Sequence, residues 1–199
     1  LNVSGGTIAG TIATATQNSI TTATGLTAVG AANTLTTVAG IPFYQGDTGS
    51  IYTHNVSGTD DTAQYNTAYG ISAMDAITTG DNNTALGYDA LGVNSTGEKN
   101  TAVGANSMQL HTTGNNNTAV GESSMDSNTT GASNVAIGQE AMNANTTGSE
   151  NTVVGRNALA ANTTTDSNTA VGANALAANT AAENTAIGYN AAALNTTGV

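Results

Sequence analysis

Few side chains in this sequence could carry out chemistry. Histidine occurs twice, at His54 and His111, and cysteine is absent, which removes thiolate chemistry and sulfur-ligated metal sites. In an assembly of several chains around one axis, copies of His111 could meet and bind a metal ion or an anion. However, His111 occupies a repeat position that otherwise mostly holds Asn, so we favour a substituted surface position over a ligand. We expect no metal site.

The carboxylates offer the next candidate chemistry. Asp47, Asp60 and Asp61 carry oxygen atoms that suit Ca²⁺, and a carboxylate pair could serve a glycosidase. No calcium-loop motif surrounds them, and no serine lies in a recognisable nucleophile setting. We expect solvated loop carboxylates, no cofactor, and a protein that is not an enzyme.

The bulk composition narrows the possible partners. Charged residues make up 8% of the 199 residues, against about 25% in typical soluble domains. The formal net charge is −11, and Lys99 and Arg156 are the only two cationic side chains apart from histidine, so a basic nucleic-acid footprint is absent. No apolar run approaches the roughly 20 residues of a membrane helix, and we expect no membrane insertion. Because the chain starts at Leu1, we expect a fragment of a longer polypeptide.

The elements that must position any site come from an internal repeat. From Asn66 onward, an Asn followed four residues later by Gly recurs along the chain. The interval between successive anchors is constant except for the last, which is one residue shorter. The shortening lies in a connecting loop, where a deletion is easy to accommodate. These anchor residues are Asn66, Asn83, Asn100, Asn117, Asn134, Asn151, Asn168 and Asn184.

Two columns of the repeat have nearly fixed character. The residue three after the anchor is always large and mostly aliphatic: Tyr69, Leu86, Val103, Val120, Ile137, Val154, Val171 and Ile187. The residue four after it is always glycine: Gly70, Gly87, Gly104, Gly121, Gly138, Gly155, Gly172 and Gly188. An invariant Gly indicates a positive φ or a backbone approach too close for a Cβ atom.

The rest of the repeat predicts the remaining segments of a coil. "NTAVG" alternates, so Thr and the aliphatic residue share one strand face and Ala and Gly the other. The variable residues after Gly are typical of an exposed turn and are our candidate recognition residues: Tyr88, Asp89, Glu122, Gln139, Glu140, Arg156 and Tyr189. A small-then-large pair, such as Ala90–Leu91, restarts a strand. "NTTG" then supplies a second turn with left-handed Asn and Gly.

We therefore predict an all-β fold, a parallel β-roll or β-solenoid of about eight 17-residue coils with two short strands each. Stacked coils would lie roughly 4.8 Å apart, with Asn ladders between them and residues such as Leu86 and Leu91 as a minimal core. Residues 1–40 are expected to form a β-rich fibre shaft, 41–65 a transition segment, and 66–199 the repeat region. The handedness of the coils stays open.

One chain is not expected to be sufficient. Burying two large side chains per coil yields roughly 1.5–3 kcal/mol each, whereas ordering each residue costs about 1.5 kcal/mol. The small Ala and Gly side chains suggest a face built for close approach of another surface. We therefore expect several chains to associate through that face.

The anchors "NTAVG", "NVAIG" (134–138) and "NTAIG" (184–188) resemble the head repeat of trimeric autotransporter adhesins of the YadA type. The longer phrase "NTAVGANALAANT" (168–180) is similar to arrays in bacteriophage tail fibres and related virion fibre proteins. This resemblance covers 66–199. It implies a homotrimer on a virion, contacts with other virion or fibre subunits, and presentation of surfaces to a host cell-surface receptor.

Three functional hypotheses follow. The first is a structural trimeric fibre of a bacteriophage that spaces or presents host-binding surfaces. The second is an autotransporter-like adhesin on the bacterial cell surface, and the third is an ice-binding solenoid with ladders of Thr. "NST" and "NTT" at Asn94 and Asn128 match glycosylation acceptors, but the same residues make the predicted turn, and we expect the match to be incidental.

Overall fold

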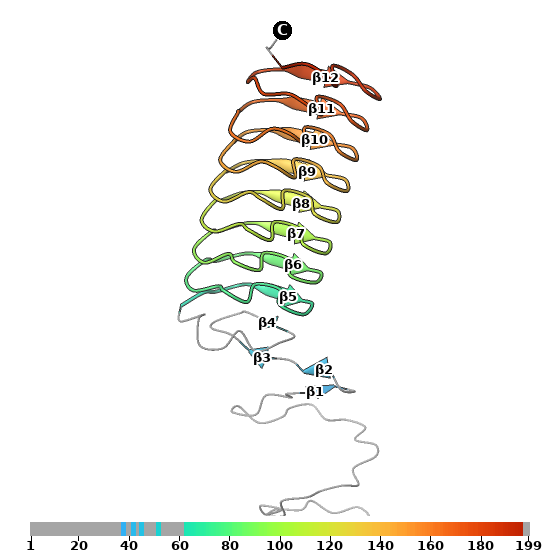
Figure 1. The fold of residues 1–199 in the computed structure, drawn as a ribbon. Helices are drawn as coiled ribbons and strands as arrows, with labels where there is room; N and C mark the ends of the chain where they lie inside the picture. Colours follow the sequence, from blue (N-terminus) through green and yellow to red (C-terminus); the bar gives the residue numbers. More distant parts are fainter. Residues whose placement is uncertain (1–36, 39–40, 43, 46–50, 53–61, 197–199) are drawn as a thin grey trace, which may run out of the picture. The chain divides into compact units, whose positions relative to one another are not determined.

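The computed structural model describes residues 37–38, 41–42, 44–45, 51–52 and 62–196. All regular elements in these ranges are β-strands, and the repeat region is a stack of coils (Figure 1). Four two-residue strands come first: β1 (Thr37–Val38), β2 (Ile41–Pro42), β3 (Tyr44–Gln45) and β4 (Ile51–Tyr52). One three-residue strand per repeat follows: β5 (Thr67–Tyr69), β6 (Thr84–Leu86), β7 (Thr101–Val103), β8 (Thr118–Val120), β9 (Val135–Ile137), β10 (Thr152–Val154), β11 (Thr169–Val171) and β12 (Thr185–Ile187).

Strands β5 to β12 form one parallel sheet in which each repeat pairs with the next. The register places equivalent residues opposite each other, for example Thr84 with Thr101 and Ala85 with Ala102. Strand β4 pairs parallel with β5, and β3 pairs antiparallel with β4. The prediction of a parallel β-solenoid with a 17-residue repeat is therefore confirmed. We number the coils one to eight from Asn66 to Asn184.

The prediction of two strands per coil is wrong. The segment expected to restart a strand, such as Ala90–Leu91, forms turns instead. Leu91 has φ 52°, and its equivalents in the other coils are also left-handed, with φ between 47° and 56°. The turn still bonds to the next coil, because Leu91 N donates to Ser107 O at 3.0 Å. Coil-to-coil hydrogen bonding thus continues where extended geometry does not.

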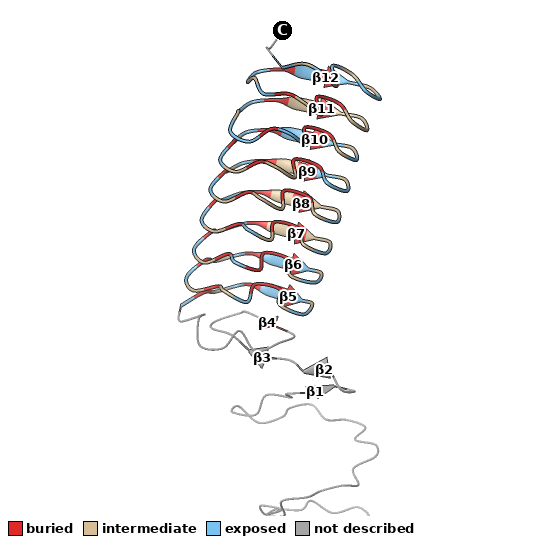
Figure 2. Cartoon of the chain, viewed as in Figure 1, coloured by how far each residue is buried: buried red, intermediate tan, exposed pale blue. Residues whose placement is uncertain are grey.

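The core lies on the opposite strand face from the one we expected. In β5 to β12 the central residue of the strand, Ala except for Val153, is buried, and the large residue after it points outward, so that Leu86 is 47% exposed while Ala85 is fully buried. Leu91 is fully buried, as predicted. The central Ala or Val column and the Met or Leu column from the facing turn form one buried cluster along the stack (Figure 2). The long side chains from the turn fill a narrow interior that leaves room mainly for Ala on the strand.

The anchor Asn residues form a buried ladder, as predicted. The backbone N–H of each anchor donates to the side-chain oxygen of the anchor one coil earlier, for example Asn117 N to Asn100 Oδ1 at 3.0 Å. Each side-chain amide also crosses its own coil, as Asn117 Nδ2 donates to Gly131 O at 2.8 Å. Buried polar groups are costly unless paired, and here one side chain pairs several of them.

The glycine column meets both conditions that we expected of it. Gly121 has φ 136°, and a Cβ atom there would lie 2.5 Å from the carbonyl oxygen of Gly138 in the next coil. The "NTTG" segment bends the chain as predicted, at Ser95 and Thr96, and Gly97 N donates to Asn94 Oδ1 at 3.1 Å across the bend. The left-handed conformation that we expected there is wrong, because neither Asn94 nor Gly97 has a positive φ. The positive φ values fall instead six and eight residues after each anchor and one residue before it, as in Asp89, Leu91 and Lys99.

The expected fibre shaft (1–40) lies outside the described residues except for β1. The transition segment (41–65) is described at β2, β3, β4 and residues 62–65, which contain the strand pairs given above.

Candidate functional site

The outer face of the sheet is the most extensive candidate surface. Thr and the large residue of each strand point outward, while the central residue points inward. The large residues form one line along the stack, which we call the aliphatic row; Leu86, Ile137 and Val154 are exposed, and Val103 and Val120 are half-buried. The row consists of Tyr69, Leu86, Val103, Val120, Ile137, Val154, Val171 and Ile187. This corrects our assignment of the Ala and Gly face to association, since Ala packs within the coil and Gly packs against the next coil of the same chain.

The candidate recognition residues flank the aliphatic row. All are exposed except Asp89, which is half-buried: Tyr88, Glu122, Gln139, Glu140, Arg156 and Tyr189. In the middle coils they pair with each other, as Gln139 Nε2 donates to Glu122 Oε2 at 3.2 Å. With its amide oriented to satisfy both neighbours, Asn157 donates to Glu140 at 2.8 Å and accepts from Arg156 at 3.2 Å. The flank is therefore polar in the middle coils and carries tyrosines in the second and last coils.

A second exposed line consists of threonines at the end of each coil. The first residue of each Thr-Thr or Ser-Thr pair holds the stack together, since Thr112 Oγ1 donates to Thr129 O at 3.0 Å. The second residue is exposed in six consecutive coils: Thr79, Thr96, Thr113, Thr130, Thr147 and Thr164. These exposed threonines recur at the spacing of the coils.

The carboxylates of Asp89 in the second coil and Asp126 in the fourth coil lie close enough to interact. Gln109 Nε2 donates to Asp89 Oδ2. Partial burial, together with the negative charge of Asp89, raises the pKa of Asp126. Asp126 Oδ1 and Asn106 Oδ1 are buried atoms without a hydrogen-bond partner. No group of three or more His, Cys, Asp or Glu side chains that could hold a metal ion occurs in the described part of the chain.

His111 is not a surface residue, and our placement of it is wrong. It is fully buried in the third coil, so copies of it cannot meet on the outside of the stack. Its Nε2 pairs with Gly114 O at 2.8 Å, and its Nδ1 pairs with Asn128 Nδ2 at 3.0 Å. Burial lowers the pKa of His111, and the two hydrogen bonds oppose that shift. With both ring nitrogens occupied, His111 has no nucleophile to activate.

The remaining candidate residues divide into two groups. His54, Asp47, Asp60 and Asp61 lie outside the described residues. Asn94 and Asn128 are fully buried with their amides hydrogen-bonded to Gly97 O and Gly131 O, which keeps a glycosyltransferase from reaching them in the folded coil.

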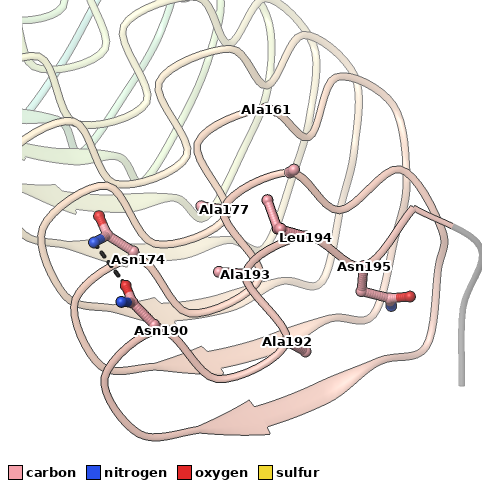
Figure 3. A pocket seen from close by; sticks show the side chains of 9 residues that line it. Ala161, Asn174, Ala177, Asn190, Ala192, Ala193, Leu194 and Asn195 are labelled. Atoms are coloured by element: carbon pink, nitrogen blue, oxygen red, sulfur yellow. Dashed lines mark hydrogen bonds between the residues drawn. The ribbon is translucent and has the colours of Figure 1, made fainter.

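An open hollow lies on the last three coils (Figure 3). It is lined mainly by alanines, among them Ala161, Ala177 and Ala192, with Leu194 on its wall. The amides of Asn174 and Asn190 lie at its border and are joined by a 2.9 Å hydrogen bond. Its lining contains no ionisable side chain, so it offers shape without acid–base chemistry.

No protein-family model matches this chain, and comparisons with curated proteins and with solved structures give no match. Within the described ranges, no helix has the length and apolar character that a membrane span requires.

Sequence reasoning missed a second glycine column. Gly80, Gly97, Gly114, Gly131 and Gly148 each lie so close to the next coil that a Cβ atom would approach a carbonyl oxygen to between 2.2 and 2.6 Å. The signal was present in the sequence, since these glycines follow five consecutive anchors at one fixed offset. We interpreted the glycine at this position as a turn residue within one coil, whereas it permits close contact between two coils.

Proposed function

We propose that this chain is a structural fibre protein of a bacteriophage, assembled as a homotrimer, that spaces or presents surfaces for host attachment. The observation that carries the proposal is the aliphatic row, because a continuous line of exposed and half-buried large apolar side chains is typical of an interaction surface. Eight equivalent positions recur at roughly the strand spacing.

The period of the row favours a second copy of the chain as the partner. A partner with another spacing would match the row at one or two coils and then fall out of register. A copy of this chain has the same spacing and can contact Val103, Val120, Ile137 and Val154 with equivalent residues. The number three comes from the resemblance to trimeric adhesin and fibre repeats, and three copies around one axis would bury the row on every chain.

The polar character of the described region supports a mechanical role. Its buried polar side chains are Asn, Ser and one His, each of which serves the stack. The exposed variable residues Glu122, Gln139, Glu140 and Arg156 supply surface variety without altering the columns that hold the coils together. In this proposal they contact other fibre subunits or a host receptor.

The test is the mass of the particle in solution. Analytical ultracentrifugation of the full chain is expected to give the mass of three chains, and a stably folded monomer would refute the proposal. Ile137→Glu places a charge in the aliphatic row and is expected to dissociate the trimer. Thr147→Glu adds the same charge at an exposed position of the same coil and is expected to leave the trimer intact.

Finding where the protein is located distinguishes the bacteriophage-fibre hypothesis from the bacterial-adhesin hypothesis. Labelling the chain on purified particles and on bacterial cells, followed by electron microscopy, is expected to place it on a virion. Exclusive labelling of the cell surface supports the adhesin.

The exposed threonine line favours one further candidate, an ice-binding surface. Six threonines at the coil spacing present hydroxyl and methyl groups to water in a regular array. A thermal-hysteresis assay decides this candidate: a gap between melting and freezing that disappears in Thr113→Glu supports ice binding, and no gap removes it.

A further inference from the structure

His111 interrupts a second buried amide ladder. Eleven residues after the anchor, the second to seventh coils carry a polar residue that is fully buried in every case: Asn94, His111, Asn128, Asn145, Asn162 and Asn179. We call this set the inner ladder. It runs beside the anchor ladder and links neighbouring coils, as Asn145 Nδ2 donates to Asn128 Oδ1 at 2.9 Å.

In its neutral form, His111 makes two of the hydrogen bonds of the asparagine that it replaces. An Asn in the inner ladder donates to the carbonyl three residues ahead, as Asn128 does to Gly131 O at 3.0 Å. His111 Nε2–H does the same toward Gly114 O at 2.8 Å. An Asn also accepts from the next coil, and His111 Nδ1 accepts from Asn128 Nδ2 at 3.0 Å. These partners require the proton on Nε2 and the lone pair on Nδ1.

A second proton on the ring cannot be accommodated by a local change. Protonated Nδ1 would direct an N–H toward the N–H of Asn128, and only rotation of the Asn128 amide would turn an oxygen toward it. That rotation would take Nδ2 away from Gly131 O and Oδ1 away from Asn145 Nδ2. One proton in the third coil therefore breaks hydrogen bonds in the fourth and fifth coils.

The surroundings offer no compensating charge. The third coil, 100–116, contains no acidic or basic residue other than His111. The coils on either side carry Asp89, Glu98, Lys99, Glu122 and Asp126, which are exposed or half-buried. None of them contributes to the shift in the pKa of His111, which burial lowers.

We propose that His111 makes the junction between the third and fourth coils an acid-sensitive joint, where the stack loosens when the imidazole is protonated. The direction follows from the unfolded chain, in which His111 binds a proton with an ordinary pKa of 6.5. The folded chain binds that proton only at lower pH. The stability that neutral His111 contributes is complete above about pH 6.5 and is lost as the pH falls toward its folded pKa. The joints between all-Asn coils lack this response.

His111→Asn is a matched control, because it restores the residue found at this position in six other coils. Both full-length chains are melted at about pH 7.5 and about pH 5, a range in which histidine titrates. The wild-type chain is expected to lose on the order of 5 °C more in melting temperature than the variant between these conditions. Asp126 and the other carboxylates are present in both chains, so the difference isolates His111. Equal losses would overturn the proposal.

Hydrogen exchange, corrected for the intrinsic effect of pH, locates the change. In the wild type at about pH 5, where histidine is protonated, amides of 106–131 are expected to lose protection before those of 152–176. A uniform loss of protection from exchange along the stack would contradict an acid-sensitive joint. So would the same local loss of protection in His111→Asn.

Discussion

Gly121 in the fourth coil and Gly188 in the last coil occupy the same repeat position and have φ values of 136° and 128°. Their surroundings differ. A Cβ atom on Gly121 would lie 2.5 Å from Gly138 O, whereas a Cβ atom on Gly188 would meet nothing nearer than 3.9 Å. The same residue in the same conformation is thus required by a neighbouring coil in one place and by the backbone alone in the other.

Other columns also differ in the sixth to eighth coils. In the eighth coil the Met or Leu of the core is replaced by Ala192, which is exposed, and Ile187 of the aliphatic row is 72% exposed. In the second glycine column Thr165 replaces Gly, and its Oγ1 donates to Ala181 O at 3.1 Å in the shortened coil that follows. The comparison separates two demands on the glycine column: the positive φ acts at both positions, and the close approach of a following coil acts at Gly121.

Alanine at the two glycines is expected to give the largest contrast. Gly121→Ala forces two backbones apart and should lower the free energy of unfolding by about 4 kcal/mol, at the upper end of single substitutions. Gly188→Ala meets only backbone strain and should cost about 1–2 kcal/mol. Urea unfolding followed by circular dichroism measures both, and equal costs would show that φ alone fixes this column.

Removing a core side chain is expected to give the next largest effect. Met125 is fully buried between coils, so Met125→Ala should lower the free energy of unfolding by about 3 kcal/mol. Ala192→Leu adds a side chain to the last coil of the same column, where half of its surroundings are solvent. It should change stability by less than about 1 kcal/mol in the same urea assay. A larger gain would mean that the last coil already has a closed core.

The smallest expected effect comes from Asp126 and depends on pH. Its raised pKa means that the folded state disfavours the carboxylate, so Asp126 lowers stability above its folded pKa and stops doing so as the pH falls below that value. Asp126→Asn should therefore raise the melting temperature by about 1–2 °C at neutral pH, with the gain shrinking toward about pH 4. Glu183→Gln removes the same charge from an exposed position in the seventh coil and should give no such gain. An equal rise in melting temperature in both variants would show that the effect comes from the net charge of the chain.

The period, the parallel stacking, the Asn anchor ladder and the glycine requirement could all be predicted from the sequence, because each depends on identical residues lying above one another. Which face of each strand lines the core could not be predicted from the sequence. Large residues such as Leu86 are usually assigned to a core. Here the interior is filled from the opposite turn by Leu91 and its equivalents, so the strand contributes Ala. That exchange depends on left-handed Leu and Met residues, a conformation that their side chains do not favour.

The candidate surfaces were predicted in part. Tyr88, Glu122 and Arg156 are exposed as expected, since variable columns are free of packing constraints. His111 could not be placed correctly from its type, because polar columns occur both outside and inside this stack. The indication was the inner ladder itself, where Asn recurs in place of any charged residue.

The anchor ladder also gives the stack a direction of growth. Each anchor N–H donates to the side-chain oxygen of the preceding anchor, so Asn100 Oδ1 is in place before Asn117 is needed. A ribosome delivers the coils in this same order. Every completed coil then presents an acceptor to the next one, so that folding can spread from coil to coil by contacts between nearest neighbours.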